Sequence, residues 1–172
     1  LRSDASYHDI QVTGIDCPDR LMLDNLAKIT ASVEGVNLVG RVVTVDVTQQ
    51  EDRASNARIE YVIGSSVDPK IVEHLRSGIK PGETVLVILD SDHRTPHVLE
   101  ELRLYGAMVT KGSYMIVEDT IINGHPVLPT WGPGPMEAVQ EFLKDNKAFQ
   151  PDERREKLLL TFNRTGFLKK VV

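Results

Sequence analysis

Short β-branched runs alternate with longer amphipathic segments along most of this chain. The strand-like runs are 8–14, 41–47, 58–63, 84–89 and 113–117. Apolar residues keep helical spacing in the segments 18–33, 69–77, 96–105 and 136–143. Strands that alternate with helices are typical of βα units, whose right-handed crossovers make the strands parallel. We therefore predict an α/β fold with a mostly parallel sheet, in which the very apolar run 84–89 is a central strand covered on both faces.

The last part of the chain has a different pattern. Two β-rich runs, 156–162 and 166–172, are joined by a short polar turn and predict an antiparallel hairpin that closes the sheet. The segment 123–135 is rich in proline and glycine, which predicts an ordered loop. We see no internal repeat or linker and expect one domain over residues 1–172. Because the chain starts with Leu1 rather than Met, we also expect that an N-terminal segment is missing from it.

Composition narrows the classes of function. The formal net charge is −5, which argues against a nucleic-acid partner, because phosphate binding needs clustered Lys and Arg. The single cysteine, Cys17, cannot form an internal disulfide, and no apolar stretch has the length of a membrane span. We expect a cytoplasmic protein with no nucleic-acid or membrane partner, and the sequence is compatible with a homo-oligomer without establishing one.

Acidic side chains lie near the end of three of the predicted strands or directly after it. They are Asp46, Asp90, Asp92, Glu118 and Asp119. The carboxyl ends of parallel strands meet at one edge of the sheet, which is where ligands bind in open α/β folds. Carboxylates that converge there repel one another unless a cation, a proton or a ligand hydroxyl lies between them.

These acids suit two kinds of role. An acid that ends the second strand of a nucleotide-binding half typically accepts hydrogen bonds from ribose hydroxyls, which suits Asp46. Asp92, Glu118 and Asp119 offer three oxygen ligands to Mg²⁺ and leave coordination positions for water and substrate. The alternative is that the acids cap helices or lie in solvated loops, because Asp is common after strands.

Four segments of the second half carry a resemblance to a known family. In chain order they are Val87-Ile88-Leu89-Asp90-Ser91-Asp92-His93, Val117-Glu118-Asp119-Thr120, Asn123-Gly124-His125-Pro126-Val127 and Gly132-Pro133-Gly134-Pro135. Together they resemble the cephalosporin hydroxylase (CmcI-like) family, which groups with rhamnosyl O-methyltransferases. The resemblance runs from about Arg41 to the end of the chain.

The resemblance implies a Rossmann-like class I methyltransferase fold, with S-adenosylmethionine as methyl donor and Mg²⁺ or a similar divalent cation. It implies methyl transfer to a hydroxyl of a small molecule, either a sugar or a secondary metabolite. By position, the metal ligands that it implies are Asp92, Glu118 and Asp119. The positions that it implies for donor binding are Gly14, Asp46, Ser65, Ser66 and Asp90.

The chain departs from this family in the loop after the first strand, where a glycine-rich turn approaches the donor. Gly14 fits the beginning of that turn, but Pro18-Asp19-Arg20 stands where the family has Gly-Gly-Ser. Proline removes an amide donor, and larger side chains obstruct close approach of the backbone. The alternative function is therefore a catalytically degenerate binding module with the methyltransferase fold. A nicotinamide-dependent dehydrogenase would need a Gly-x-Gly-x-x-Gly turn after the first strand, which the sequence lacks.

His93 is our candidate catalytic base, for the case that a metal alone does not lower the pKa of the substrate hydroxyl enough. Arg94 cannot take this role, because a guanidinium stays protonated at neutral pH. The alternative for His93, and for His125, is a loop histidine with satisfied hydrogen bonds. Trp131 is expected either to wall a substrate pocket or to anchor its loop.

Overall fold

The computed structural model describes residues 11–16, 30–34, 40–49, 53–156 and 161–172. The chain separates into two compact units, residues 1–42 and residues 43–172.

The first unit contains an antiparallel pair of strands. β1 (Gln11–Asp16) pairs with β2 (Thr30–Glu34), with a register shift between Val12 and Gly14. The strand predicted at 8–14 thus has its described part in β1. The helix predicted over 18–33 is wrong at its end, because β2 is extended there, and its remainder lies outside the described residues. Thr30 and Val33 are β-branched, which favours an extended backbone over a helix.

β3 (Val42–Asp46) and β4 (Ile59–Ile63) form a second two-stranded sheet, and both confirm predicted strands. The helix α1 (Pro69–Gly78) follows and is also confirmed. Its start is explained by the sequence, because the Asp68 side chain accepts a hydrogen bond from the Lys70 amide at 2.8 Å and a proline occupies the first turn.

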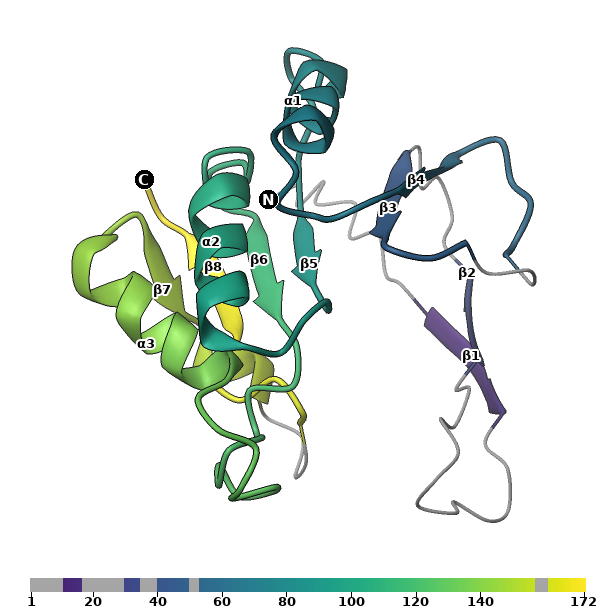
Figure 1. Cartoon of the computed structure of the whole chain (residues 1–172). Coiled ribbons are helices and arrows are strands. Elements are labelled where there is room, and N and C mark those ends of the chain that lie inside the picture. The colour runs from purple at the N-terminus through teal and green to yellow at the C-terminus, as the bar shows by residue number, and fades with distance from the viewer. Residues whose placement is uncertain (1–10, 17–29, 35–39, 50–52, 157–160) are drawn as a thin grey trace, which may run out of the picture. The chain divides into compact units, whose positions relative to one another are not determined.

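The largest sheet has four strands in the order β5-β6-β8-β7 (Figure 1). β5 (Val87–Leu89) and β6 (Tyr114–Val117) are parallel, whereas β8 (Phe167–Lys170) is antiparallel to both β6 and β7 (Phe149–Pro151). The helices α2 (Thr95–Gly106) and α3 (Pro135–Asp145) contact each other and, except for residues at their ends, match the two predicted helices.

One buried core joins the sheet and the helices. Its members come from α1, β5, α2, the segment after α2, β6, α3, β7 and β8, and they are Val72, Leu89, Val98, Leu102, Tyr105, Val109, Met115, Val117, Ala138, Val139, Phe142, Phe149 and Leu168. Among the helices that the structure describes, none has the length and apolar character needed to cross a membrane.

The prediction that the run 84–89 is a central strand covered on both faces is wrong within the described sheet. β5 is the first strand in the four-stranded order, and within the described sheet it pairs with β6 alone. Leu86 and Ile88 are 50% and 55% exposed, whereas Leu89 is buried. An apolar run reports a tendency to be buried, but it does not report the position of a strand in the sheet.

The C-terminal run 166–172 contains the strand β8, as predicted, and β8 pairs antiparallel with β6 and with β7. Most of the other predicted strand, 156–162, lies outside the described residues. Glu156 ends the 3-10 helix η1 (Glu153–Glu156), and its carboxylate accepts a hydrogen bond from the Thr165 amide at 2.7 Å. The strand β7 was not predicted, because three residues are too few to carry a strand pattern.

Candidate functional site

The ends of β5 and β6 lie next to each other, as expected for parallel neighbours. Leu89 pairs with Val117, and the Glu118 amide donates to the Leu89 carbonyl at 3.0 Å. The acids that follow the two strands, Asp90 on one and Glu118 with Asp119 on the other, therefore begin at the same level of the sheet edge.

Three potential metal ligands gather at this edge. One ligand atom from each of Asp90, His93 and Asp119 lies within 4.8 Å of the other two. His93 Nε2 is 3.1 Å from Asp119 Oδ2 and 3.5 Å from Asp90 Oδ1. Although Nε2 is buried, it forms no hydrogen bond of acceptable geometry with any described residue. A buried nitrogen that faces two carboxylate oxygens without hydrogen bonding has its lone pair available either to accept a proton or to bind a divalent cation.

The Glu118 carboxyl belongs to the same crowded region. Its pKa is raised above the ordinary range, first by burial and then by the negative charges of Asp90 and Asp119, while His93 opposes the rise. Carboxylates that raise one another's pKa lie close enough to share a cation, which would remove the repulsion.

The backbone at Asp119 supports a functional role for this edge. Asp119 has φ 52°, in the left-handed region that few residues other than glycine adopt. Strain of this kind costs free energy and concentrates at functional sites, although aspartate tolerates it better than most residues. Here the left-handed residue directly follows β6 and carries one of the clustered carboxylates.

Of the three residues predicted to bind metal, only Asp119 belongs to this group of potential ligands among the described residues, and Asp92 and Glu118 do not. Asp92 is exposed and, among the described residues, does not belong to the cluster of potential ligands. Asp90, which we predicted to contact the donor, lies in the cluster instead, together with the predicted base His93. The spacing of Asp90 and His93, three residues apart, was the sequence signal that would have linked them.

The loop 123–135 fixes the position of His93 from one side. Trp131 Nε1 donates to the His93 carbonyl at 3.2 Å, and the Thr95 hydroxyl donates to the Gly134 carbonyl at 2.8 Å. The Trp131 ring is 40% exposed, so one side chain both anchors this loop and leaves an aromatic surface open.

Glu137 holds the same loop to the start of α3. One carboxylate oxygen accepts the Gly134 amide at 2.8 Å, and the other lies 2.8 Å from His125 Nε2 and 2.9 Å from Asn123 Nδ2. Burial of the carboxylate raises its pKa, but the hydrogen bonds outweigh burial and lower the pKa of Glu137 to about 2. His125 therefore has the structural role that was one of its two alternatives.

The residues predicted to bind the donor fall into separate places. Asp46 and Ser65 lie near each other, because the Gly64 amide donates to the Asp46 carbonyl at 2.8 Å. Ser66 Oγ faces α2 and lies 3.1 Å from His97 Nε2. Gly14 belongs to β1 in the first unit, and Pro18-Asp19-Arg20 lies outside the described residues.

The Asp46 carboxylate already has partners. Thr48 donates to Oδ1 from its amide at 3.0 Å and from its hydroxyl at 3.3 Å, and Arg53 Nη2 lies 3.3 Å from Oδ2. The amide hydrogen bond from Thr48 is the main cause of a lowered pKa at Asp46. A carboxylate has room for about four hydrogen bonds, so a ribose hydroxyl would share Asp46 with these groups or displace Arg53.

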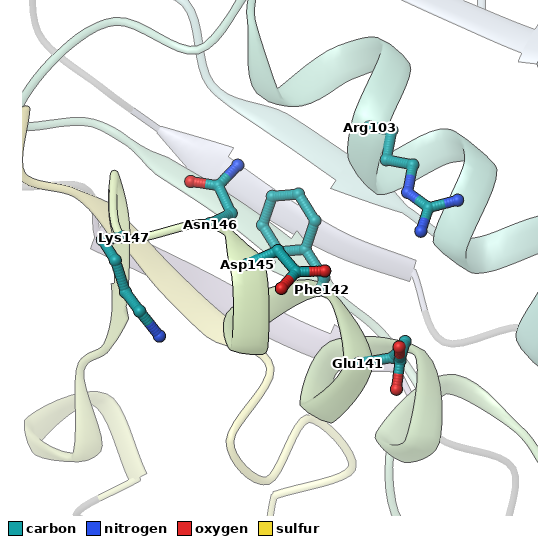
Figure 2. Close-up of a pocket in the computed structure, with 6 residues that line it drawn as sticks. All are labelled: Arg103, Glu141, Phe142, Asp145, Asn146 and Lys147. Carbon is teal, nitrogen blue, oxygen red and sulfur yellow. The ribbon is translucent and has the colours of Figure 1, made fainter.

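A cavity among the described residues lies elsewhere. It has a volume of about 310 Å³ and is lined by residues of α2, of α3 and of the turn after α3 (Figure 2). Its lining includes two basic side chains, Arg103 and Lys147, and two acidic ones, Glu141 and Asp145. Its place at the C-terminal end of α3 differs from the strand-end cluster, so we do not assign the chemistry to it.

Comparison with known proteins places these features in a family. The family model for rhamnosyl O-methyltransferase/CmcI matches residues 22–171. This chain belongs to that family. The resemblance that the sequence motifs carried is thereby confirmed.

Two relatives show how much of the family's length this chain covers. A rhamnosyl O-methyltransferase from Mycobacterium tuberculosis is 44% identical over 114 residues, which are 63% of this chain and 45% of the relative. A rhamnosyl O-methyltransferase from Mycobacterium leprae is 37% identical over 134 residues, which are 74% of this chain and 58% of the relative. The chain thus spans about half the length of the curated relatives that it matches.

A solved structure shows the fold. MycE methyltransferase from the mycinamycin biosynthetic pathway, crystallised in complex with Mg and SAH, matches with a TM-score of 0.50 and 16% identity. The match covers 77% of this chain and 37% of the MycE chain. The predicted Rossmann-like class I methyltransferase fold is therefore confirmed.

Proposed function

We propose that this chain is the catalytic domain of a metal-assisted, S-adenosylmethionine-dependent O-methyltransferase that acts on a hydroxyl of a sugar or secondary metabolite. The observation that carries the proposal is the cluster of Asp90, His93 and Asp119 at the ends of two parallel strands. Family membership supports the reaction class, since relatives are named rhamnosyl O-methyltransferases, and the MycE structure contains Mg and SAH.

As metal ligands we propose Glu118 and Asp119 together with Asp90, rather than Asp92. The reason is proximity, since an Asp90 oxygen lies within 4.8 Å of ligand atoms of both His93 and Asp119. Glu118 is outside that group of atoms, but the negative charges of Asp90 and Asp119 act on its carboxyl. A divalent cation held by these oxygens would lower the pKa of a bound substrate hydroxyl and hold its oxygen in place.

In this proposal His93 Nε2 accepts the proton that the substrate hydroxyl loses. Its geometry meets the first requirement of a general base, because Nε2 faces the carboxylates that would hold the hydroxyl oxygen. S-adenosylmethionine would supply the methyl group, and its transfer from the sulfonium to the hydroxyl oxygen would form the carbon–oxygen bond and remove the positive charge on sulfur. We propose that Trp131, whose indole donates to the His93 carbonyl and whose ring lies 5.6 Å from the Arg94 guanidinium, contacts the acceptor through its exposed part.

Asp46 and Ser65 are proposed to hold the ribose and adenine side of the donor, with Gly14 and Ser66 as the further predicted contacts. One observation favours the second candidate function, a binding module without catalysis. The Asp46 carboxylate contacts Thr48 and Arg53, so the donor must share or break existing contacts.

Calorimetric titration with S-adenosylmethionine, with and without Mg²⁺, tests the enzymatic proposal. We expect donor binding, and we expect methyl transfer to a rhamnose-containing acceptor only when a divalent cation is added. Donor binding without any methyl transfer would favour the binding module. No donor binding in either condition would refute the enzymatic proposal.

Two isosteric variants two residues apart test the ligand set. In Asp90→Asn we expect Mn²⁺ affinity, measured by calorimetry, to fall more than the about 10- to 100-fold that loss of a hydrogen-bond partner of a ligand costs. In Asp92→Asn we expect affinity close to that of the wild type, because Asp92 does not belong to the cluster of potential ligands among the described residues. The reverse pattern would restore Asp92 as the ligand and remove Asp90.

The remaining features of the proposal concern the whole protein. We propose that the chain acts as one methyltransferase domain on a small hydroxylated molecule in the cytoplasm. The single cysteine supports a reducing compartment, because the chain does not depend on internal disulfides. Light scattering after size-exclusion chromatography would determine whether it forms a homo-oligomer.

A further inference from the structure

A fully buried acid lies in α2 directly behind the proposed metal site. Glu101 is 2% exposed, and its neighbours on the same helix face are the core residues Val98, Leu102 and Tyr105. A carboxylate rarely occupies such a place, because an ionised group in an apolar interior loses its hydration. The apolar spacing of this helix face was the sequence signal that would have singled out Glu101.

The partners of Glu101 do not compensate for its burial. Ser91 Oγ is 2.8 Å from both carboxylate oxygens, so one hydroxyl is shared between them. His97 Nε2 lies 3.5 Å from Oε1. Since a carboxylate can accept about four hydrogen bonds, Glu101 is poorly satisfied for a buried acid. Stability alone therefore does not explain its presence, because an uncharged residue of the same shape would cost less to bury.

The same contacts connect Glu101 to the metal side of the site. Ser91 directly follows Asp90 and lies within the turn that ends at His93, so its hydroxyl fixes the backbone between two members of the cluster. The loop contact of Trp131 holds this turn at the His93 carbonyl, and Glu101 holds it at Ser91.

Glu101 also connects to the donor side. His97 Nε2, beside Glu101, lies 3.1 Å from the Ser66 hydroxyl, and the Tyr105 hydroxyl donates to the Ser66 carbonyl at 2.6 Å. Burial and the negative charge of Glu101 raise the pKa of Tyr105 to about 12, so this phenol remains a donor at physiological pH.

We propose that Glu101 is a positioning residue, whose buried carboxylate fixes the Asp90–His93 turn through Ser91 and the Ser66 segment through His97. The proposal rests on the metal site of the proposed function. It assigns Glu101 no contact with substrate, donor or metal.

Glu101→Gln tests the proposal, with Glu100→Gln as the matched control. Both variants make the same chemical change on α2, but Glu100 is exposed. The measurements are Mn²⁺ affinity by calorimetry and thermal unfolding without metal. For Glu101→Gln we expect Mn²⁺ affinity to fall about tenfold, because the neutral amide accepts from Ser91 through one oxygen and more weakly than the carboxylate. We expect its unfolding temperature to be equal to that of the wild type or higher, because a buried charge is removed. Glu100→Gln should change neither.

Ser91→Ala tests the same contact from its other partner, and it keeps the proposal testable if Glu101→Gln does not fold. It should weaken Mn²⁺ binding at least as much as Glu101→Gln does. The double variant should bind no more weakly than Ser91→Ala alone, since both changes act on the same contact between Ser91 and Glu101. Wild-type Mn²⁺ affinity in a folded Glu101→Gln or in Ser91→Ala would overturn the proposal and leave the metal site intact. Lower stability of Glu101→Gln with unchanged metal affinity would make Glu101 merely structural. Absence of Mn²⁺ binding by the wild type would instead refute the metal site itself.

Discussion

Replacement of Glu137 by alanine should destabilise the protein in a way that depends on pH. Glu137 accepts hydrogen bonds from the Gly134 amide, from Asn123 and from His125, so its loss removes the cap of α3 and the tie to the loop together. These contacts lower its pKa from 4.5 to about 2. At about 1.4 kcal/mol for each pH unit, the difference corresponds to about 3 kcal/mol of folding free energy.

Partial exposure of Glu137 reduces this contribution to the folding free energy. The Glu137 side chain is 28% exposed, and solvent screening weakens its interactions, so we expect Glu137→Ala to cost about 2 kcal/mol at pH 7. The sign of the pH effect follows from a folded-state pKa that lies below the unfolded one. The stabilisation is complete above about pH 4.5 and is lost as the pH falls towards 2. The difference between the wild type and Glu137→Ala should therefore shrink below about pH 4.5.

Urea unfolding followed by circular dichroism at several pH values measures this difference. Glu141→Gln is the control, because Glu141 lies on the same helix and its 2.6 Å ion pair with Lys144 is exposed. An exposed pair of this kind contributes little to stability, because water and salt screen it. A cost for Glu137→Ala that stays constant from pH 7 to pH 3 would refute the role of the ionised carboxylate. An equal cost for Glu141→Gln would refute the role of the cap.

Three further outcomes follow from individual contacts. Leu102→Ala removes a side chain that is 0% exposed in the core, and urea unfolding should show a loss of about 2–5 kcal/mol; a loss below 1 kcal/mol would contradict its place there. Gly166→Ala would bring a methyl group into collision with the Val117 carbonyl oxygen. We therefore expect about 3 kcal/mol of destabilisation and a lower unfolding temperature by calorimetry. An unchanged unfolding temperature would show that the backbone at the end of β6 can move to accommodate the methyl group. Asp46→Asn should weaken S-adenosylmethionine binding about tenfold in calorimetry, whereas unchanged affinity would remove Asp46 from the donor site.

The sequence predicted most of the helices and strands of the second unit because their local signals agree with their surroundings. The proline and the Asp68 cap mark the start of α1, and the apolar spacing of α2 places Val98 and Leu102 in the core. Position within the sheet is a different kind of information. β5 is as apolar as a central strand, yet it stands at the end of the described order with Ile88 exposed.

The candidate site was predictable to the level of strand ends, but not to the level of individual ligands. Parallel neighbours bring the acids after β5 and β6 together, which the alternation of elements already indicated. Whether Asp90 or Asp92 faces Glu118 depends on the direction of each side chain in the turn after β5. That direction is set by contacts distant in sequence, such as those of Ser91 with Glu101 and of His93 with Trp131.

These contacts also explain how a three-residue edge strand can support a precise site. β5 has one neighbouring strand in the described sheet, and its Ile88 is exposed, so the strand alone restrains the turn after it weakly. The turn is instead held at Ser91 by a carboxylate from α2 and at the His93 carbonyl by an indole from the loop before α3. Metal ligands must keep their geometry without the ion if binding is not to be weakened by the cost of ordering them. The positions of α2 and of the 123–135 loop, rather than the pairing of β5, should therefore determine metal affinity.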